Sequence, residues 1–276
     1  MSTAPRAEPR SLAPPERRTV AVYDNVAVGA YRVITASEAD GVPAPQPGQF
    51  FMLASAERWG GGADERPYLP RAFSHARARE GRLSFLLEVI GPGTERLAQL
   101  QPGEGLNLVG PLGIGWRLPR DGSRALLVGG GIGTAPLLCL QDDLGADAPV
   151  LLGFRSAEQA MAASLFAGRP EVATDDGSVG RQALVTDVLR EHLDGEPAAT
   201  VYACGPPAML EAVRLACAQS GAPAQLALES GMACGFGACF GCVVPTKAGY
   251  VRLCVDGPVV DAEDLESALL PSDGHR

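Results

Sequence analysis

The sequence has few positive charges and no long apolar run, and these two absences exclude several classes of protein. Among 276 residues, 23 are Lys or Arg and 32 are Asp or Glu, so the formal net charge is −9. Nucleic-acid or anionic-membrane binding would need clustered Lys and Arg, and no such stripe is present. The longest apolar stretches are strand-sized and broken by Gly or Pro, which is too short for a bilayer. We therefore expect a soluble, cytoplasmic protein with no nucleic-acid or membrane partner.

Histidine is also scarce, and its three positions do not suggest hydrolytic catalysis. His75, His192 and His275 are widely separated and accompany no Ser-His-Asp or paired-carboxylate pattern. We expect all three to be ordinary residues on the solvent side, and we assign no catalytic residue.

Cysteine is the most informative residue that is present. Four of the seven cysteines stand at C-x4-C-x2-C-x11-C spacing: Cys234, Cys239, Cys242 and Cys254. This spacing is typical of the [2Fe–2S] cluster of plant-type ferredoxins, and the glycines between the cysteines allow backbone N–H groups to turn toward sulfur. A zinc site would normally show two Cys-x2-Cys pairs, and only one is present. A disulfide framework fits poorly with an odd cysteine total. The spacing therefore predicts an iron-sulfur electron carrier.

The chain changes in texture along its length, which predicts three units after a tail. Residues 1–18 are rich in Pro and lack the apolar segment of a signal peptide, so we expect a disordered tail. Residues 19–118 contain short apolar or alternating runs separated by turns, which predicts an antiparallel β-barrel. Residues 119–224 alternate strand and helix patterns, which predicts an α/β domain with a parallel doubly wound sheet. Residues 225–276 form the cluster domain.

A glycine-rich turn opens the α/β domain, where dinucleotides bind in such folds. The residues we assign to NAD are Gly129, Gly130, Gly131, Gly133 and Thr134, together with Cys204, Gly205 and Pro206 after a later strand. Both turns are expected at the carboxyl edge of the sheet, where backbone can approach a pyrophosphate. The alternatives are that the glycines serve tight packing and that Cys204 is an inert buried residue.

In the predicted barrel, two short motifs are candidates for flavin contacts. The first is Arg71, Ala72, Phe73 and Ser74; the second contains Gly93 and Thr94 at the start of a predicted helix. An Arg can pair with a cofactor phosphate, a Phe can lie against a ring, and a helix start can face a pyrophosphate. A surface arginine and a plain hairpin turn are the alternatives.

Taken in order, these motifs make the chain resemble the ferredoxin-reductase superfamily, and within it the electron-transfer subunits of NAD-linked, two-subunit dihydroorotate dehydrogenases. The resemblance implies an FAD-binding barrel, an NAD domain and a [2Fe–2S] domain. It departs from the family at Ala72, where Pro is usual, and at Leu87-Glu88, where an aromatic-Arg pair is usual beside the cofactor. By position we still assign Leu87 and Glu88 to the cofactor-binding residues. Because a carboxylate repels phosphate, Glu88 predicts weaker FAD binding unless another residue compensates.

By the same resemblance, electrons pass from an FMN-containing catalytic subunit through the cluster and FAD to NAD+, in pyrimidine (UMP) biosynthesis. The implied assembly is a heterotetramer with two copies of each subunit. Two other functions remain open at this point. One is a small subunit of a sulfide dehydrogenase or a ferredoxin-NAD(P) transhydrogenase, and the other is a non-catalytic redox sensor. NAD and NADP are not distinguished either, because Arg155 could meet a 2′-phosphate and no acidic ribose ligand is evident.

Two aromatic residues in the cysteine loop suggest where a partner binds. Phe236 and Phe240 alternate with glycines and cysteines in a loop that must stay near the surface for electrons to leave. We expect at least one ring to be exposed and to form a protein interface. The alternative is that both rings fold inward and shield the cluster.

Overall fold

The computed structural model describes residues 15–38, 42, 44–60, 68–119, 123–195 and 199–269. The first part of this chain forms a closed antiparallel barrel, as predicted, with strand order β1-β2-β5-β4-β3-β6. Its strands are β1 (Glu16–Val28), β2 (Tyr31–Ser37), β3 (Phe50–Ser55), β4 (Arg71–Arg79), β5 (Arg82–Glu88) and β6 (Gly105–Leu112). Apolar side chains such as Ile34, Phe51 and Phe85 fill the interior. The helix α1 (Pro92–Ala98) follows β5.

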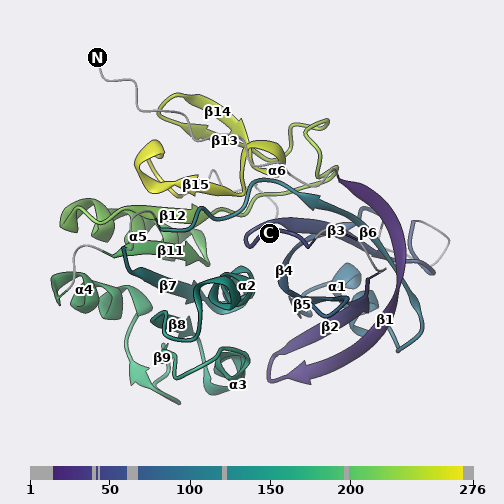
Figure 1. The fold of residues 1–276 in the computed structure, drawn as a ribbon, viewed down its shortest axis with the longest axis horizontal. Coiled ribbons are helices and arrows are strands. Elements are labelled where there is room, and N and C mark those ends of the chain that lie inside the picture. The colour runs from purple at the N-terminus through teal and green to yellow at the C-terminus, as the bar shows by residue number, and fades with distance from the viewer. Residues whose placement is uncertain are drawn as a thin grey trace.

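The second part is a seven-stranded sheet with the order β10-β9-β8-β7-β11-β12-β15 (Figure 1). Its strands are β7 (Ala125–Gly130), β8 (Val150–Phe154), β9 (Glu171–Thr174), β10 (Arg181–Gln182), β11 (Thr200–Cys204), β12 (Ala224–Ala227) and β15 (Val259–Asp261). All neighbouring pairs are parallel except β12 with β15. This arrangement confirms the predicted α/β sheet and adds one antiparallel edge strand.

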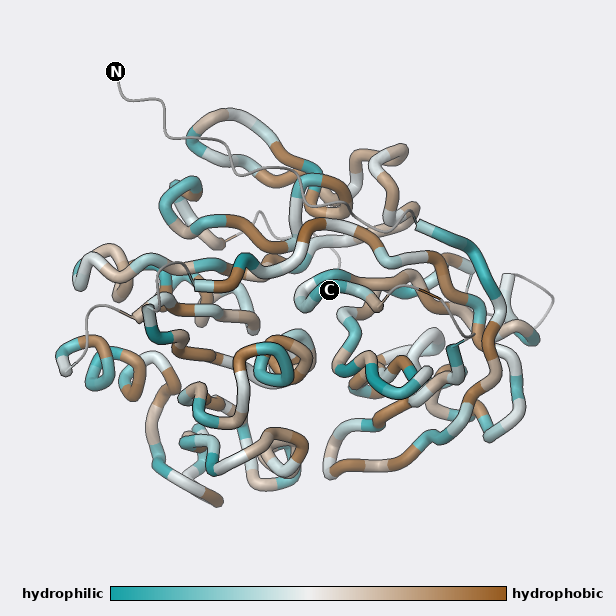
Figure 2. The backbone as a smooth tube through the Cα atoms, in the orientation of Figure 1, coloured by the Kyte–Doolittle hydropathy of each residue, from teal (hydrophilic) through white to brown (hydrophobic). Residues whose placement is uncertain are grey.

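Helices cover both faces of this sheet, because successive residues of a strand point to opposite sides. The helices are α2 (Ala135–Leu144), α3 (Ala157–Ala160), α4 (Val185–Gly195) and α5 (Pro207–Ser220), with the 3-10 helices η1 (Gly131–Thr134), η2 (Met161–Leu165) and η3 (Ala262–Asp264). In β7, Leu126 and Val128 belong to the core under α4 and α5, whereas Leu127 belongs to the core under α2. In Figure 2, α4 alternates brown and teal around its turns, as an amphipathic helix on a sheet should.

The barrel and the sheet meet at α2, which lies between them in Figure 1. Arg77 in β4 donates a hydrogen bond to the Leu165 carbonyl at 2.6 Å and pairs with Asp142 of α2. Trp116, just after the barrel, donates to the carbonyl of Pro136 at the start of α2. These contacts join the two units along one seam.

The cysteine-rich segment leaves the sheet after β12 and returns to it at β15. It contains the hairpin β13 (Val243–Thr246) and β14 (Gly249–Arg252), followed by the short helix α6 (Leu253–Asp256), at the top of Figure 1. Since β12 and β15 pair with each other, both ends of the segment are anchored in the nucleotide sheet. The sheet therefore continues past residue 224, where the sequence suggests a domain boundary.

The position of His75 and the start of the first strand both differ from the expectations. His75 was expected on the solvent side, but it is 1% exposed, so that prediction is wrong. Its Nδ1 lies 3.0 Å from the Gln49 carbonyl oxygen and its ring packs edge-on to Phe51, because β4 at this point faces the seam with α2. The strand β1 already begins at Glu16, within the predicted tail, whereas residues 1–14 and His275 lie outside the described residues.

No helix among the described residues combines the length and the apolar character needed to cross a membrane.

Candidate functional site

A cavity of about 280 Å³ opens at the seam between barrel and sheet, and the predicted flavin motif lines it. The four residues Arg71, Ala72, Phe73 and Ser74 all contribute, from the start of β4. Opposite them are Ile132, Ala135 and Pro136 around the start of α2. The remaining wall includes Leu228, Glu229, Ser230 and Met232, which lead into the cysteine segment.

The two flavin motifs converge, although 20 residues separate them in the sequence. A Cβ atom built on Gly93 would lie only 2.6 Å from Nε of Arg71, so the guanidinium rests directly on the backbone of the second motif. Thr94 fixes that turn: its Oγ1 accepts hydrogen bonds from the N–H groups of Ile90 (2.9 Å) and Gly91 (3.1 Å). A guanidinium beside the first turn of a helix suits a cofactor phosphate. This arrangement differs from the alternative in which Arg71 is an ordinary surface arginine.

A second cavity, of about 460 Å³, lies along the carboxyl edge of the sheet. Five of the predicted dinucleotide residues line it: Gly130, Gly131, Gly133, Gly205 and Pro206. The two glycine turns therefore meet at one edge, as expected for this fold. Gly129, Thr134 and Cys204 are buried behind the loop and are not among the described lining residues of either cavity.

Close packing explains some of the glycines in this loop, which was the alternative to dinucleotide binding that the sequence left open. A Cβ atom on Gly133 would lie 2.5 Å from the backbone nitrogen of Gly205, so only glycine lets the two turns approach. Gly131 differs, because it has φ of 54° and a Cβ built there would meet only the Tyr31 hydroxyl, at the ordinary contact distance of 3.8 Å. The loop thus combines one packing glycine with one position open to a ligand.

Two buried hydroxyl groups beside this loop have no hydrogen-bond partner among the described residues: Thr134 Oγ1 and the Tyr31 OH. The Tyr31 OH lies 3.8 Å from the position of a Cβ built on Gly131. An unpartnered buried hydroxyl is costly, and a bound polar ligand can satisfy it. Of the two, only the Tyr31 hydroxyl lies beside a cavity-lining residue of the loop, Gly131, so it is the one that a polar ligand in the cavity can satisfy.

Cys204 and Leu87, both assigned to cofactor sites from the sequence, are buried and are not among the described lining residues of either cavity. Burial, and then the nearby Glu229 carboxylate, raise the pKa of Cys204 well above its usual value, and the Gly133 turn contacts the Cys204 backbone. This position agrees with the alternative of an inert buried cysteine. Leu87 lies inside the barrel core, so its side chain is a packing residue in this structure.

Glu88 and Glu229 are the two carboxyl groups that line both cavities. Sequence reasoning assigned Glu88 to the cofactor site, as a departure from the family's usual Arg, and missed Glu229 altogether. Glu229 follows the end of β12 and reaches solvent through the cavities, yet the surrounding protein raises its pKa by burial. Its place directly after a predicted strand could have identified Glu229, since the carboxyl ends of parallel strands lie together at the ligand-binding edge of the sheet.

The four cysteines of the predicted cluster come together in two pairs. Cys242 and Cys254 are buried, with their sulfurs 3.1 Å apart. The thiols of Cys234 and Cys239 form the second hydrogen-bonded pair. Among the described residues, no three Cys, His, Asp or Glu side chains converge on one metal-ion position. Two thiol pairs suit a cluster in which each of two irons takes two protein ligands.

Backbone N–H groups point at these sulfurs, which is the second feature a cluster needs. The N–H of Gly237 lies 3.1 Å from the Cys254 sulfur, and that of Gly241 lies 3.4 Å from the Cys239 sulfur. Burial opposes ionisation of Cys234, but the N–H groups of Phe236 and Cys239 outweigh it and lower its pKa to about 6. The donor set and its surroundings therefore fit a cluster of negative charge.

The cysteine loop lies close to the flavin cavity. Met232 lines the cavity and precedes Cys234 by two residues. A Cβ on Gly235 would meet Met52 of the barrel at 2.6 Å, and Gly235 has φ of 81°, so the loop packs against β3 through a glycine. Cluster and flavin positions are thus adjacent.

The outer side of the loop carries exposed aromatic rings. Phe236 is 60% exposed, Phe240 63% and Tyr250, in the neighbouring hairpin, 79%. The rings of Phe236 and Phe240 therefore do not fold inward over the cysteines, which was the alternative to an interface. The guanidinium of Arg252 lies 5.6 Å from the Phe240 ring centre and helps to hold it outward.

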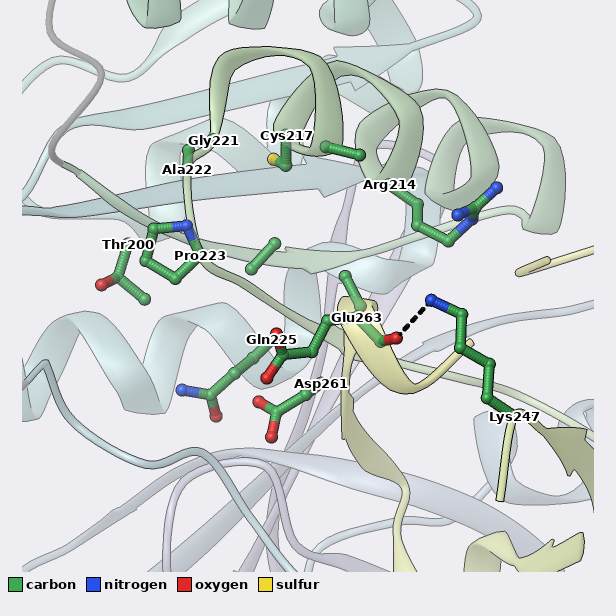
Figure 3. A pocket seen from close by; sticks show the side chains of 13 residues that line it. Thr200, Arg214, Cys217, Gly221, Ala222, Pro223, Gln225, Lys247, Asp261 and Glu263 are labelled. Carbon is green, nitrogen blue, oxygen red and sulfur yellow. Dashed lines mark hydrogen bonds between the residues drawn. The ribbon is translucent and has the colours of Figure 1, made fainter. Parts of the chain in front are cut away.

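A third cavity, of about 400 Å³, lies between α5 and the returning strand β15 (Figure 3). Its clearest polar contact is a hydrogen bond of 2.7 Å from Lys247 Nζ to the Glu263 carbonyl oxygen. Of the described residues that line it, none belongs to the predicted cofactor motifs. We assign it no role.

Comparisons with known proteins bear on these sites. The family described as the iron-sulfur cluster binding domain of dihydroorotate dehydrogenase B matches residues 229–266. A relative from Bacillus caldolyticus, named dihydroorotate dehydrogenase B (NAD(+)), electron transfer subunit, is 40% identical over 261 residues, covering 91% of this chain and 98% of its own. A relative of the same name from Caldanaerobacter subterraneus subsp. tengcongensis is 38% identical over 228 residues, covering 80% and 87%.

Two solved structures are similar in fold. The NADH-dependent reduced ferredoxin-NADP oxidoreductase is 24% identical with a TM-score of 0.76, and 91% of each chain is covered. A ferredoxin NADP+ reductase from Neisseria gonorrhoeae, solved with bound FAD and NADP, is 19% identical with a TM-score of 0.57, covering 74% of this chain and 92% of that one. At these identities the likeness concerns the fold alone.

Proposed function

This chain belongs to the family of dihydroorotate dehydrogenase B (NAD(+)) electron transfer subunits, and from this premise we propose that it carries electrons from a dihydroorotate-oxidising subunit to NAD+ in pyrimidine biosynthesis. The observation that carries the proposal is the adjacency of three sites within one chain. The paired cysteines, the cavity behind Arg71 and the cavity at the glycine turns follow one another without an intervening domain.

We assign the cluster to the two cysteine pairs and the FAD to the 280 Å³ cavity. When bound, FAD supplies the chemistry that joins two-electron hydride exchange with NAD to one-electron exchange with the cluster. The protein holds the cofactors in place: Arg71 and the Thr94 turn suit the pyrophosphate, and Phe73 and Ser74 border the rest of the cavity. NAD occupies the cavity at Gly130, Gly131 and Gly205.

The position of Glu88 changes the expectation for FAD. A carboxylate replacing the usual Arg predicted weaker phosphate binding, but Glu88 receives a hydrogen bond from Gln159 of the nucleotide domain at 3.2 Å. Arg71 is the guanidinium that lies at the Gly93 turn. Glu88 therefore acts at the border with the dinucleotide cavity, while phosphate binding rests on Arg71.

The partner is an FMN-containing catalytic subunit, in a heterotetramer with two copies of each chain. The exposed rings of Phe236, Phe240 and Tyr250 lie on the cysteine segment, where electrons must enter from the partner. The sequence boundaries at residues 18/19, 118/119 and 224/225 are adjusted in this proposal, because β1 begins at Glu16 and the cluster segment lies between β12 and β15 of the nucleotide sheet. A cytoplasmic location is also part of the proposal.

The decisive experiment is copurification of the native complex followed by a dihydroorotate-dependent NAD+ reduction assay. Iron, acid-labile sulfide and FAD are measured on the same sample. We expect two irons, two sulfides and one FAD per chain, since one cluster and one flavin are assigned. Activity with sulfide or reduced ferredoxin in place of dihydroorotate would contradict the proposal. A chain that NADH cannot reduce would point to a redox sensor.

A further inference from the structure

One corner of the dinucleotide cavity holds charges of both signs, and their balance bears on which dinucleotide can bind. Arg155 follows β8, the second strand of the sheet domain, where an Arg commonly accommodates the 2′-phosphate of NADP. The acidic ribose ligand of NAD-binding domains is not found at this place in the sequence. The folded chain brings three carboxyl groups to the same cavity from elsewhere. Glu229, after β12, acts on Cys204, whereas Glu88 from β5 of the barrel and Asp175 after β9 belong to the elements that contact the backbone around Arg155.

Gln159 fixes the Glu88 carboxylate at this corner. The Gln159 Nε2 donates to Glu88 Oε1 at 3.2 Å, and its Oε1 accepts the backbone N–H of Arg155 at 3.1 Å. Gln159 is buried in α3, so both ends of its amide are committed and its orientation is set. The amide thereby ties a barrel carboxylate to the backbone of Arg155.

Electrostatics place both charged groups around the same buried phenol. Burial, and then the Glu88 carboxylate, raise the pKa of Tyr31, while Arg155 lowers it. The Tyr31 OH itself has no hydrogen-bond partner among the described residues and lies beside Gly131 of the same cavity. Glu88 and Arg155 are linked geometrically through the Gln159 amide, and both line the same cavity.

The two aspartates after β9 differ in what they contact. Asp176 Oδ1 accepts hydrogen bonds from the Ser178 backbone N–H (2.9 Å) and hydroxyl (2.5 Å), which hold the turn together. Asp175 uses its backbone N–H to reach the Phe154 carbonyl, and it contributes to the cavity lining. The corner therefore carries two carboxylates against the single guanidinium of Arg155.

We infer that the Glu88 carboxylate, held by Gln159, accepts hydrogen bonds from the adenosine ribose diol of NAD and makes this chain select NAD over NADP. The inference rests on the proposed function, because it concerns the same dinucleotide cavity. A diol donates two hydrogen bonds to a carboxylate, whereas a 2′-phosphate adds negative charge beside Glu88 and Asp175 and is repelled. Arg155 alone does not reverse that balance.

Calorimetry with 5′-AMP and 2′,5′-ADP tests the inference on the purified chain with its cofactors bound. We expect the native chain to bind 5′-AMP more tightly than 2′,5′-ADP. Glu88→Gln should reduce this preference about tenfold, the size of one lost charge repulsion in a partly hydrated site. The matched control is Glu158→Gln, which removes the same charge from an exposed residue of α3 outside the cavity lining. It should leave the preference unchanged.

Gln159→Leu provides the second variant, because it leaves the Glu88 charge in place but removes its anchor. It should weaken 5′-AMP binding several-fold while 2′,5′-ADP stays excluded. Rates of NADH and NADPH oxidation with an artificial acceptor, measured as separate KM and kcat values, give the second readout. The Glu88→Gln change should appear mainly in the KM for NADPH.

Two results would overturn the inference while leaving the proposed function intact. One is tighter binding of 2′,5′-ADP than of 5′-AMP by the native chain, which would mean that Arg155 dominates the corner. The other is an unchanged preference in Glu88→Gln. Failure of the proposed function looks different, since it appears in the copurified complex as activity with sulfide or reduced ferredoxin in place of dihydroorotate, or as a chain that NADH cannot reduce.

Discussion

The chain contains two glycine-rich loops that bind cofactors by different physics: the dinucleotide loop at Gly129–Thr134 and the cysteine loop at Cys234–Cys242. In the cysteine loop, Gly235 and Gly237 have positive φ, and N–H groups turn toward the sulfurs. In the dinucleotide loop, Gly133 is needed because another backbone passes 2.5 Å from where its Cβ would be. Both loops place glycines at close contacts, but in the cysteine loop a Cβ on Gly235 or Gly237 would meet a side chain, whereas on Gly133 it would meet the backbone of the second turn.

The difference teaches which functional features are visible in a sequence. Ligand atoms at set intervals determine the cysteine loop, so its spacing can be recognised directly. A packing glycine depends on a partner 72 residues away, at Gly205, which only the folded sheet identifies.

Cys254→Ala should abolish the cluster while the dinucleotide loop stays functional. It removes one sulfur of the buried pair with Cys242, so we expect iron and acid-labile sulfide to fall to about zero per chain while FAD content is retained. Metal analysis and the visible spectrum measure this. Cys217→Ala is the matched control, because Cys217 is equally buried but lies in α5. An intact cluster in Cys254→Ala would show that the pairing is wrong.

Acid should lower the stability of the chain through His75, which is buried in β4 at the seam between the barrel and α2. Burial lowers the pKa of His75 to about 4 from 6.5, despite its hydrogen bond to Gln49. Because the unfolded chain takes up the proton first, the stability from neutral His75 is complete above pH 6.5 and is lost as the pH falls toward 4. The expected loss is about 2–3 kcal/mol in unfolding free energy by pH 4.5. Denaturant unfolding at pH 7 and 4.5 measures it.

A His75→Gln variant should lack this part of the acid dependence. The surface residue His192, paired with Glu171, provides the comparison through His192→Gln. Equal acid sensitivity of His75→Gln and the native chain would contradict the prediction.

Arg71→Ala should weaken FAD binding by about 1.5–3 kcal/mol, because a charge-assisted hydrogen bond to phosphate is lost. FAD dissociation constants measure it. Arg77 is unsuitable as a control, since it bonds to Leu165 and Asp142 across the seam. Arg82→Ala is better matched, because Arg82 is exposed and lies over the Tyr23 ring. Equal dissociation constants for the two variants would refute the assignment of Arg71.

Gly133→Ala tests the packing of the dinucleotide loop against Gly241→Ala in the cysteine loop. Overpacking against the Gly205 backbone should cost about 1–3 kcal/mol in unfolding free energy and weaken NADH binding. At Gly241 the nearest atoms would be 3.5 Å away, an ordinary contact, so we expect about 0.5 kcal/mol or less. The opposite order of effects would mean that the two loops do not differ as described.

Phe240→Ser should have the smallest effect on the isolated chain and act only on association. Loss of one exposed ring is expected to weaken binding of the catalytic subunit by about 1–2 kcal/mol, while the cluster spectrum and NADH-to-FAD reduction stay intact. The control is Tyr68→Ser, because Tyr68 is an exposed aromatic residue that lies outside the cysteine segment. Unchanged association in both Phe240→Ser and Phe236→Ser would move the docking surface elsewhere.

The order of strands and helices could be predicted from local periodicity, and the cluster ligands could be predicted from the spacing of the cysteines. The membership of β15 in the sheet could not, since its pairing with β12 joins residues on either side of the cysteine segment. The burial of His75 was also missed, because alternation along β4 does not reveal that both of its faces are covered at the seam. Gln159 and Glu229 acquire their roles only when the barrel and the sheet meet.

The pairing of β12 with β15 has a consequence for how the metal site assembles. The cysteine segment is a loop of about 30 residues whose ends the sheet already holds together at Ala227 and Val259. Closing a free loop of that length costs about 3 kcal/mol in chain entropy. In this protein the antiparallel pairing of β15 with β12 offsets that cost when the sheet folds. Cluster binding then has to order only the residues between Cys234 and Cys254. The chain without its cluster already holds both ends of this segment in place.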